Sequence, residues 1–170
     1  MRIIVSDTSC IIDLGKGRLI RASLRLPYRF VMPDVLFENE LIDFGPIDRE
    51  ELRGLGLQVV ELDGAGTERA LAHFTRHQRS LTVRDCFALA LAEQTENCIL
   101  LTGDGPLRRI AEGMGIEVHG ALWIVDQLEQ HRLASMKELA DALRRFEEDP
   151  LVFLPRGEVR RRLRRLRGML

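Results

Sequence analysis

The sequence predicts an α/β fold, a three-layer α/β/α sandwich with a mainly parallel central sheet. Short apolar runs alternate with longer stretches in which apolar residues recur every three or four positions, a pattern that indicates strands connected by helices. Two of the runs, IIV at residues 3–5 and CILL at residues 98–101, lack alternating polar residues, which is typical of central strands buried on both faces. The length of 170 residues suits one domain with a single core.

The expected strands are short runs, mostly β-branched, that are bounded by Gly, Pro, Asp or Asn. They span residues 2–6, 30–32, 57–61, 98–102 and 116–118. The stretches between them have the apolar periodicity of helices that bury one face. These helices are expected at residues 35–44, 66–77, 83–95, 106–113 and 122–131.

The C-terminal part of the chain has the pattern of an appended pair of helices. The segment SMKELADALRRF has helical periodicity, and Pro150 and Pro155 interrupt the pattern after it. Residues 156–170 carry seven Arg and one Glu, a net charge of +6, so the rest of the chain has a net charge of −7 although the total is only −1. We expect the main α/β domain at residues 1–133 and a helical extension with an Arg-rich tail at residues 134–170.

The Arg-rich tail is predicted to form an amphipathic basic helix. Val159, Leu163 and Leu166 recur at helical intervals, with Arg residues between them. Such a helix can dock on the acidic remainder of the chain, on a partner or on RNA. We favour docking onto its own domain or onto a dimer mate.

Two further features concern the environment of the chain. The N-terminal segment MRIIVSDTSC lacks the long apolar stretch of a signal peptide or a membrane helix, so we expect a cytoplasmic protein that does not enter a membrane. Cys10, Cys86 and Cys98 lack the spacing of a zinc site or a disulfide framework and are expected to be reduced packing residues. Trp123 is likewise expected in the core rather than as a platform for base stacking.

Two acidic residues follow expected central strands. Asp7 comes after the first strand and Asp104 after the fourth. The carboxyl ends of parallel strands meet at one edge of a sheet, where ligands of open α/β sheets bind. Each residue alone is equally well explained as a helix cap or a turn residue. Two carboxylates at one edge repel each other, however, unless a positive charge lies between them.

Two more acidic residues lie on expected helices. Glu38 is surrounded by the apolar residues of PDVLFENELIDF, whereas Glu40 and Asp43 can equally face solvent. Asp85 follows Thr82 by three positions, as in a capping box, and the apolar segment CFALALA after it must be buried. Asp85 is therefore expected at the rim of the sheet.

A carboxylate cluster of this kind suits Mg²⁺ or Mn²⁺, which prefer oxygen ligands. Two such ions about 3.5–4 Å apart can activate a water molecule and stabilise the leaving oxygen of a displacement at phosphorus. The cations also reverse the local charge, so that an acidic pocket accepts a polyanion. The acids therefore predict a metal site for cutting a phosphodiester.

Four segments, in order, resemble the PIN-domain family of metal-dependent nucleases: VSDTSCIIDL, MPDVLFENEL, LTVRDCFALALAEQ and ILLTGDGPLRRIAEGMGIEV. The resemblance covers residues 1–130 and implies a compact PIN-like sheet between helices. The acids that match its metal-binding and catalytic residues are Asp7, Glu38, Asp85 and Asp104. Glu38 matches a family Glu five residues after a Pro, and Asp104 matches a T-x-D pattern. Thr8, Ser9 and Thr102 are candidates to orient carboxylates or water.

The resemblance implies an endoribonuclease that cuts single-stranded RNA with Mg²⁺ or Mn²⁺. Many bacterial and archaeal members of this size are VapC-type toxins of toxin-antitoxin pairs and are homodimers, which makes an antitoxin and a second copy candidate partners. Arg84, Arg108 and Arg109 flank the expected site and are candidate contacts to RNA phosphates.

Two other functions compete with this one. The first is a PIN-fold module that binds nucleic acid or protein without turnover; a response to Mn²⁺ discriminates it from the enzyme. The second is a phosphatase of the haloacid-dehalogenase type with Asp7 as covalent nucleophile. Such enzymes need a second Asp two residues later, and that position holds Ser9, so we rank this function last.

Overall fold

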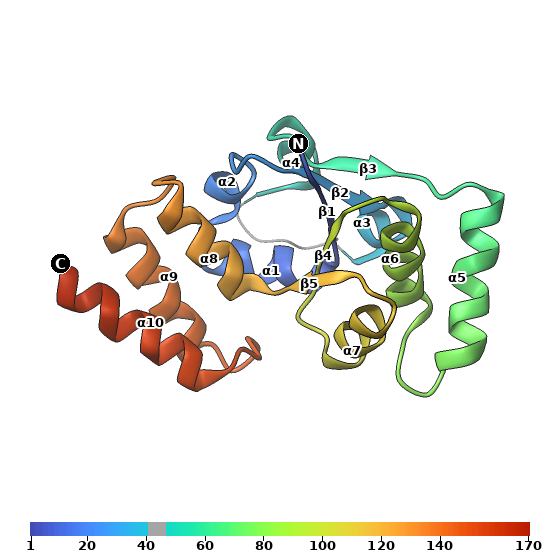
Figure 1. Cartoon of the computed structure of the whole chain (residues 1–170). Helices are drawn as coiled ribbons and strands as arrows, with labels where there is room; N and C mark the ends of the chain where they lie inside the picture. Colours follow the sequence, from blue (N-terminus) through green and yellow to red (C-terminus); the bar gives the residue numbers. More distant parts are fainter. Residues whose placement is uncertain (41–46) are drawn as a thin grey trace.

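The chain forms a five-stranded parallel sheet with helices on both faces (Figure 1). The computed structural model describes residues 1–40 and 47–170. The strand order is β3-β2-β1-β4-β5, and every neighbouring pair is parallel. The predicted three-layer α/β fold is therefore confirmed. The strands are β1 (Ile3–Ser6), β2 (Arg29–Pro33), β3 (Gln58–Val60), β4 (Ile99–Leu101) and β5 (Glu117–His119).

The two apolar runs without polar alternation are the middle of the sheet. Strands β1 and β4 are hydrogen-bonded neighbours, with Val5 opposite Leu100. Ile4, Val5 and all of β4 are fully buried. Strand β3 at one edge is only partly buried. The pattern of the sequence therefore located the central strands correctly, because only strands covered on both faces exclude polar residues.

The helices form two layers (Figure 1). Helices α1, α2, α8 and α9 pack together on one face, whereas α5, α6 and α7 cover the other, where α6 contacts β1, β2 and β4. The bounds are α1 (Thr8–Lys16), α2 (Ile20–Ser23), α3 (Asp34–Glu40), α4 (Arg49–Gly54), α5 (Gly64–His77), α6 (Val83–Gln94), α7 (Gly105–Gly113), α8 (Ala121–Gln130), α9 (Met136–Glu148) and α10 (Arg156–Met169).

Seven of these helices, α9 and α10 included, match the expected ones, with one reservation at α3. Residues 41–44 of the helix expected at 35–44 lie outside the described part of the chain. Helices α1, α2 and α4 were not among the expected elements. Helices α2 and α4 are short, with four and six residues, and segments of that length have too few turns to establish a helical period.

The C-terminal extension is a helical hairpin that docks onto its own chain. Helix α9 packs on α1 and α8, and α10 packs on α9. Val159, Leu163 and Leu166 of α10 are buried. Arg162 makes two hydrogen bonds of 2.8 Å to the carboxylate of Asp126 in α8. The Arg-rich tail is therefore packed against the rest of the chain as part of the folded structure.

Two remaining expectations can be compared with the fold. Cys10, Cys86 and Cys98 are buried and free, as expected of packing residues. In the described part of the chain, none of the helices has the length and apolar character needed to cross a membrane.

The strand order fixes where a ligand can bind. From β1 the chain proceeds to β2 and β3 on one side, whereas β4 and β5 lie on the other side of β1. Helix α1, which follows β1, and α7, which follows β4, therefore leave the sheet toward opposite faces. A crevice at the carboxyl ends of β1 and β4 is the usual ligand site of such a sheet.

Candidate active site

Asp7 lies at the centre of this crevice and is almost completely buried. It is the N-cap of α1, and its Oδ1 accepts a 2.7 Å hydrogen bond from the Thr8 amide. Its Oδ2 accepts hydrogen bonds from the hydroxyls of Thr102 (2.8 Å) and Ser9 (3.2 Å). Only 6% of the residue is exposed. The side chain is thus held in one orientation by both strands of the central pair and by α1.

The loop after β4 is connected to Asp7 through the same hydroxyls. Thr102 Oγ1 accepts a 3.0 Å hydrogen bond from the Asp104 amide, and Ser9 Oγ accepts one of 3.1 Å from the Gly103 amide. Asp104 is the N-cap of α7, and its Oδ2 accepts from the Leu107 amide at 2.8 Å. The supporting role expected for Ser9 and Thr102 thus has a physical basis: they link the two acidic turns.

Asp85 reaches the crevice from the first turn of α6. It forms a complete capping box: the Asp85 amide donates to Thr82 Oγ1 at 3.1 Å, and Asp85 Oδ2 accepts from the Thr82 amide at 2.8 Å. The helix behind it is buried on most sides. The hydrogen bonds of the capping box therefore also hold the Asp85 carboxylate at the rim of the sheet.

The structure separates Glu38 from the other acids and brings Glu40 to them instead. Glu38 is exposed and forms ion pairs with Arg49 (3.3 Å) and Arg53 (3.4 Å). Glu40 is half-buried, and Arg84 Nε lies 3.8 Å from its Oε1. Two residues correspond to about 200° around a helix, so Glu38 and Glu40 face nearly opposite sides.

The carboxylates act on one another electrostatically. The pKa of Asp7 is raised from 3.8 to about 6, mainly by burial, with smaller contributions from the charges of Asp85 and Glu40 and an opposing effect of the hydrogen bonds from Thr102 and Thr8. Burial is also the main cause of the raised pKa of Glu40 and of Asp85. The charge of Asp85 adds to the shift at Glu40, and that of Asp104 adds to the shift at Asp85. The charges of Asp7, Glu40, Asp85 and Asp104 are therefore linked by pairwise repulsions.

The chemistry of this donor set fits a divalent cation. Within residues 1–40 and 47–170 no three acidic, His or Cys side chains are close enough to hold one metal ion together. The buried Thr8 Oγ1 has no hydrogen-bond partner among the described residues, although it lies near enough to Glu40 to lower its pKa. An unsatisfied oxygen beside mutually repelling carboxylates is what a bound cation would stabilise. The types of donor atom thus fit a divalent cation. The carboxylates would have to move closer together to surround one.

The three arginines named from the sequence differ in position. Arg84 pairs with Glu40 at the crevice. Arg108, on α7, lies 3.6 Å from Glu112 and donates a long hydrogen bond of 3.5 Å to the Val118 carbonyl. Arg109 has its Nη1 close to Gly105 at the start of α7. Arg84 and Arg108 are thus next to the site on two sides.

Sequence reasoning preferred Glu38 to its neighbour Glu40 and gave Thr8 only a supporting role. The apolar residues around Glu38 favoured it over Glu40, but Leu36 and Phe37 are the side chains that α3 buries. The available signal was the helical period, which places Glu38 and Glu40 on different faces. Unless the position of α3 against the sheet is known, that period does not show which face of the helix is directed toward Asp7.

A comparison with protein families agrees with the fold. The family model DUF3368, described as a PIN domain, matches residues 3–167, which include the C-terminal helical hairpin. A search of curated proteins gave no match. PIN domains are generally nucleases, which hydrolyse phosphodiester bonds. The match covers almost the entire chain, and the chain therefore belongs to the PIN-domain family.

Proposed function

We propose that this protein is a Mg²⁺- or Mn²⁺-dependent endoribonuclease that hydrolyses phosphodiester bonds of single-stranded RNA. The observation that carries the proposal is the group of Asp7, Glu40, Asp85 and Asp104 near the carboxyl ends of β1 and β4, in which burial and the neighbouring acidic charges raise the pKa values of Asp7, Glu40 and Asp85. A positive ligand would offset this repulsion, and perturbed pKa values of this kind gather at functional sites. Membership of the PIN-domain family supplies the reaction class.

Asp7, Glu40, Asp85 and Asp104 are the residues that would hold the metal. Bound there, Mg²⁺ or Mn²⁺ would activate water as the nucleophile and stabilise the charge on the leaving oxygen. Glu40 takes the place in the proposal that the sequence had given to Glu38, because Glu38 instead pairs with Arg49 and Arg53.

The protein's own groups position the acids and the substrate. The Thr8 amide and the hydroxyls of Ser9 and Thr102 fix both oxygens of Asp7. Asp7, Asp85 and Asp104 lie at the N-termini of α1, α6 and α7. The helix dipoles there favour negative charge, including that of a substrate phosphate. Arg84 and Arg108 are positioned to contact flanking phosphates.

The likeness to VapC-type sequences supports a more specific proposal. The protein would act as the toxin of a toxin-antitoxin pair, as a homodimer, with an antitoxin protein as its inhibitor. A short open reading frame overlapping or directly preceding this one would encode that antitoxin. Finding none there would remove the toxin assignment and leave the nuclease proposal standing.

The catalytic proposal is tested with Asp7→Asn. Wild-type protein with Mn²⁺ is expected to cut a single-stranded RNA, and Asp7→Asn is expected to have no activity, because the neutral amide cannot replace the central charged ligand. Far-ultraviolet circular dichroism checks that the variant is folded. Equal cleavage by the two proteins, prepared free of contaminating nuclease, would refute the mechanism. Absence of both cleavage and any Mn²⁺-dependent stabilisation in the wild type would favour the binding module.

The choice between the two glutamates is tested by a matched pair, Glu40→Gln and Glu38→Gln. We expect Glu40→Gln to reduce cleavage at limiting Mn²⁺ by at least about tenfold, since the loss of even an outer-shell metal partner has effects of that size. Glu38→Gln removes the same charge from the same helix and is expected to keep wild-type activity. The opposite ranking would return the role to Glu38.

A further inference from the structure

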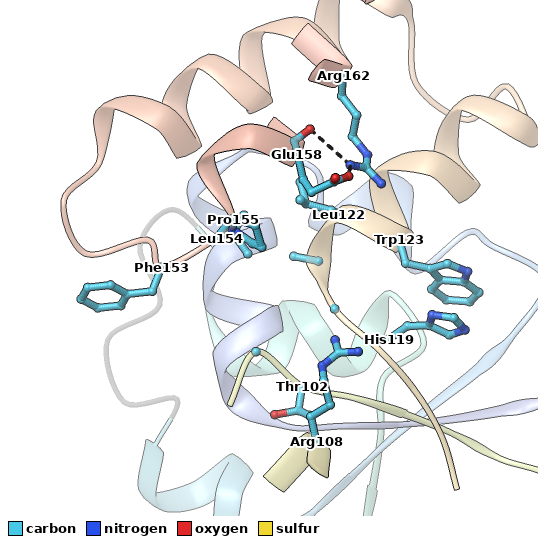
Figure 2. Close-up of a pocket in the computed structure, with 13 residues that line it drawn as sticks. Thr102, Arg108, His119, Leu122, Trp123, Phe153, Leu154, Pro155, Glu158 and Arg162 are labelled. Carbon is cyan, nitrogen blue, oxygen red and sulfur yellow. Dashed lines mark hydrogen bonds and ion pairs between the residues drawn. The ribbon is translucent and has the colours of Figure 1, made fainter. Parts of the chain in front are cut away.

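A cavity of about 440 Å³ adjoins the acidic site. It lies between the carboxyl ends of β4 and β5 and the segment that joins α9 to α10 (Figure 2). One side is formed by Thr102, Gly103 and Arg108, and the opposite side by residues 153–155 and the first turns of α10. Its volume is within the range of small-ligand sites.

The cavity is continuous with the site through the loop after β4. Thr102 and Gly103 line the cavity. The same two residues are hydrogen-bonded into the acidic site, Thr102 to Asp7 and Gly103 to Ser9. A strand whose phosphate lies at Asp7 therefore has this cavity directly beside it.

The walls combine apolar surface with one weakly neutralised cation. Leu122 and Leu154 line the interior, whereas Phe153, a residue 85% exposed, lies at the outer edge with its ring directed away from the cavity (Figure 2). Arg162 is neutralised by Asp126 and Glu158. Among the described residues, Arg108 pairs with no acidic side chain other than the exposed Glu112, at 3.6 Å, and donates a long hydrogen bond to the Val118 carbonyl. Arg108 is therefore the cavity's group for an anion.

We propose that this cavity binds a nucleotide of the RNA strand next to the scissile phosphate. The base would contact the apolar wall, the exposed Phe153 ring would rotate inward from its position in Figure 2 to stack over it, and Arg108 would bind the adjoining phosphate. A planar apolar group joined to an anion matches these walls, and stacking on aromatic side chains is a common way to bind single strands. This inference rests on the proposed function, because it takes the strand at Asp7 to be RNA.

The chain carries its own reporter for this cavity. Trp123 is the only tryptophan in the sequence and lines the cavity. Its ring is stacked on His119, with centroids 4.3 Å apart and planes at 6° (Figure 2). Its fluorescence therefore responds to occupation of the cavity and does not depend on cleavage.

The experiment titrates a short single-stranded RNA with non-cleavable linkages into the full-length protein in Mg²⁺, which keeps the strand intact and offsets the charge of the acids. Tryptophan fluorescence and the anisotropy of a label on the RNA are followed together. Phe153→Ala and Arg108→Gln test the two groups. Their matched controls are Leu151→Ala, an exposed side chain of the same segment outside the cavity lining, and Arg76→Gln, which removes an equal charge from α5.

We expect RNA to change the Trp123 signal of the wild type and of both controls with the same apparent affinity. Phe153→Ala and Arg108→Gln should bind at least about fivefold more weakly, the lower end of the effect of removing one stacking contact. RNA binding without a Trp123 change, or with unaltered affinity in Phe153→Ala, would overturn this proposal and leave the nuclease intact. A normal Trp123 response in a protein that never cleaves RNA would support the cavity and refute the nuclease.

Discussion

At the scale of single residues, Asp7 combines an unfavourable environment with a central position. Its carboxylate is buried at the end of β1, and its hydrogen bonds offset only part of the cost of ionisation, since its pKa is still raised to about 6. An ionised carboxylate that destabilises the fold although it accepts three hydrogen bonds is better explained by ligand binding than by packing. Function and stability therefore oppose each other at this residue.

This opposition predicts how the metal-free protein depends on pH. Because the folded-state pKa of Asp7 is higher than 3.8, the folded state binds the proton more tightly, and stability falls as the pH rises from 3.8 to about 6. In EDTA, Asp7→Asn should therefore equal the wild type below about pH 4 and exceed it above about pH 6, by at most about 3 kcal/mol. Urea unfolding across this range measures the difference.

The sign of that difference is decisive. An Asp7→Asn variant that is less stable than the wild type at neutral pH would mean that the hydrogen bonds of the carboxylate outweigh its burial. Adding Mn²⁺ should stabilise the wild type and leave Asp7→Asn nearly unchanged, because ligand binding to the folded state alone raises stability.

At the scale of elements, helix starts organise the site. Asp7 and Asp104 cap α1 and α7, and Asp85 completes the capping box of α6. Helix α9 begins with the same type of box, formed by Ser135 and Glu138, away from the acids. The two boxes have nearly identical hydrogen bonds, but only that of α6 holds a proposed metal ligand.

The boxes provide a prediction at this scale. Thr82→Ala and Ser135→Ala should each lower the free energy of unfolding by about 0.5–2 kcal/mol, the usual cost of losing an N-cap side chain. Only Thr82→Ala should also weaken Mn²⁺-dependent stabilisation and cleavage, because the first turn that carries Asp85 loses its anchor. Thermal unfolding with and without Mn²⁺ separates the effects. Equal metal responses in both variants would mean that the α6 cap is purely structural.

At the scale of the whole molecule, the C-terminal hairpin joins an acidic and a basic part of the chain. Arg162 and Arg165 of α10 pair with Asp126 and Glu129 of α8, and Arg160 pairs with Glu147 of α9. The segment before α10 also forms one wall of the cavity beside the acids. Docking of α10 thus contributes both to stability and to the shape of the proposed nucleotide site.

This arrangement predicts that α10 is required for a stable fold. Leu166 is fully buried, so Leu166→Ala should cost about 2–5 kcal/mol. Met169 on the same helix is 52% exposed, and Met169→Ala should change stability by no more than about 0.5 kcal/mol. Urea unfolding of both variants measures this. A tail that acted only as an arm for RNA would give two equally stable variants.

The sequence by itself determined the five strands, seven of the helices and which strands are buried on both faces. The unbroken runs IIV and CILL are the central strands, and the positions of Asp7 and Asp104 after them follow from strand ends alone. Asp85 could be placed because its cap is a local pattern with Thr82. These features depend on neighbours within a few residues, which the sequence contains directly.

Only the tertiary structure decided what depends on the direction of an element or on distant segments. Whether Glu38 or Glu40 faces Asp7 depends on how α3 is rotated against the sheet, since each helical residue turns the side chain by about 100°. The cavity combines Thr102 and Arg108 with Phe153, which come from separate parts of the chain. The Arg-rich tail could be recognised as a helix, but its acidic partners on α8 became identifiable only once the chain was folded.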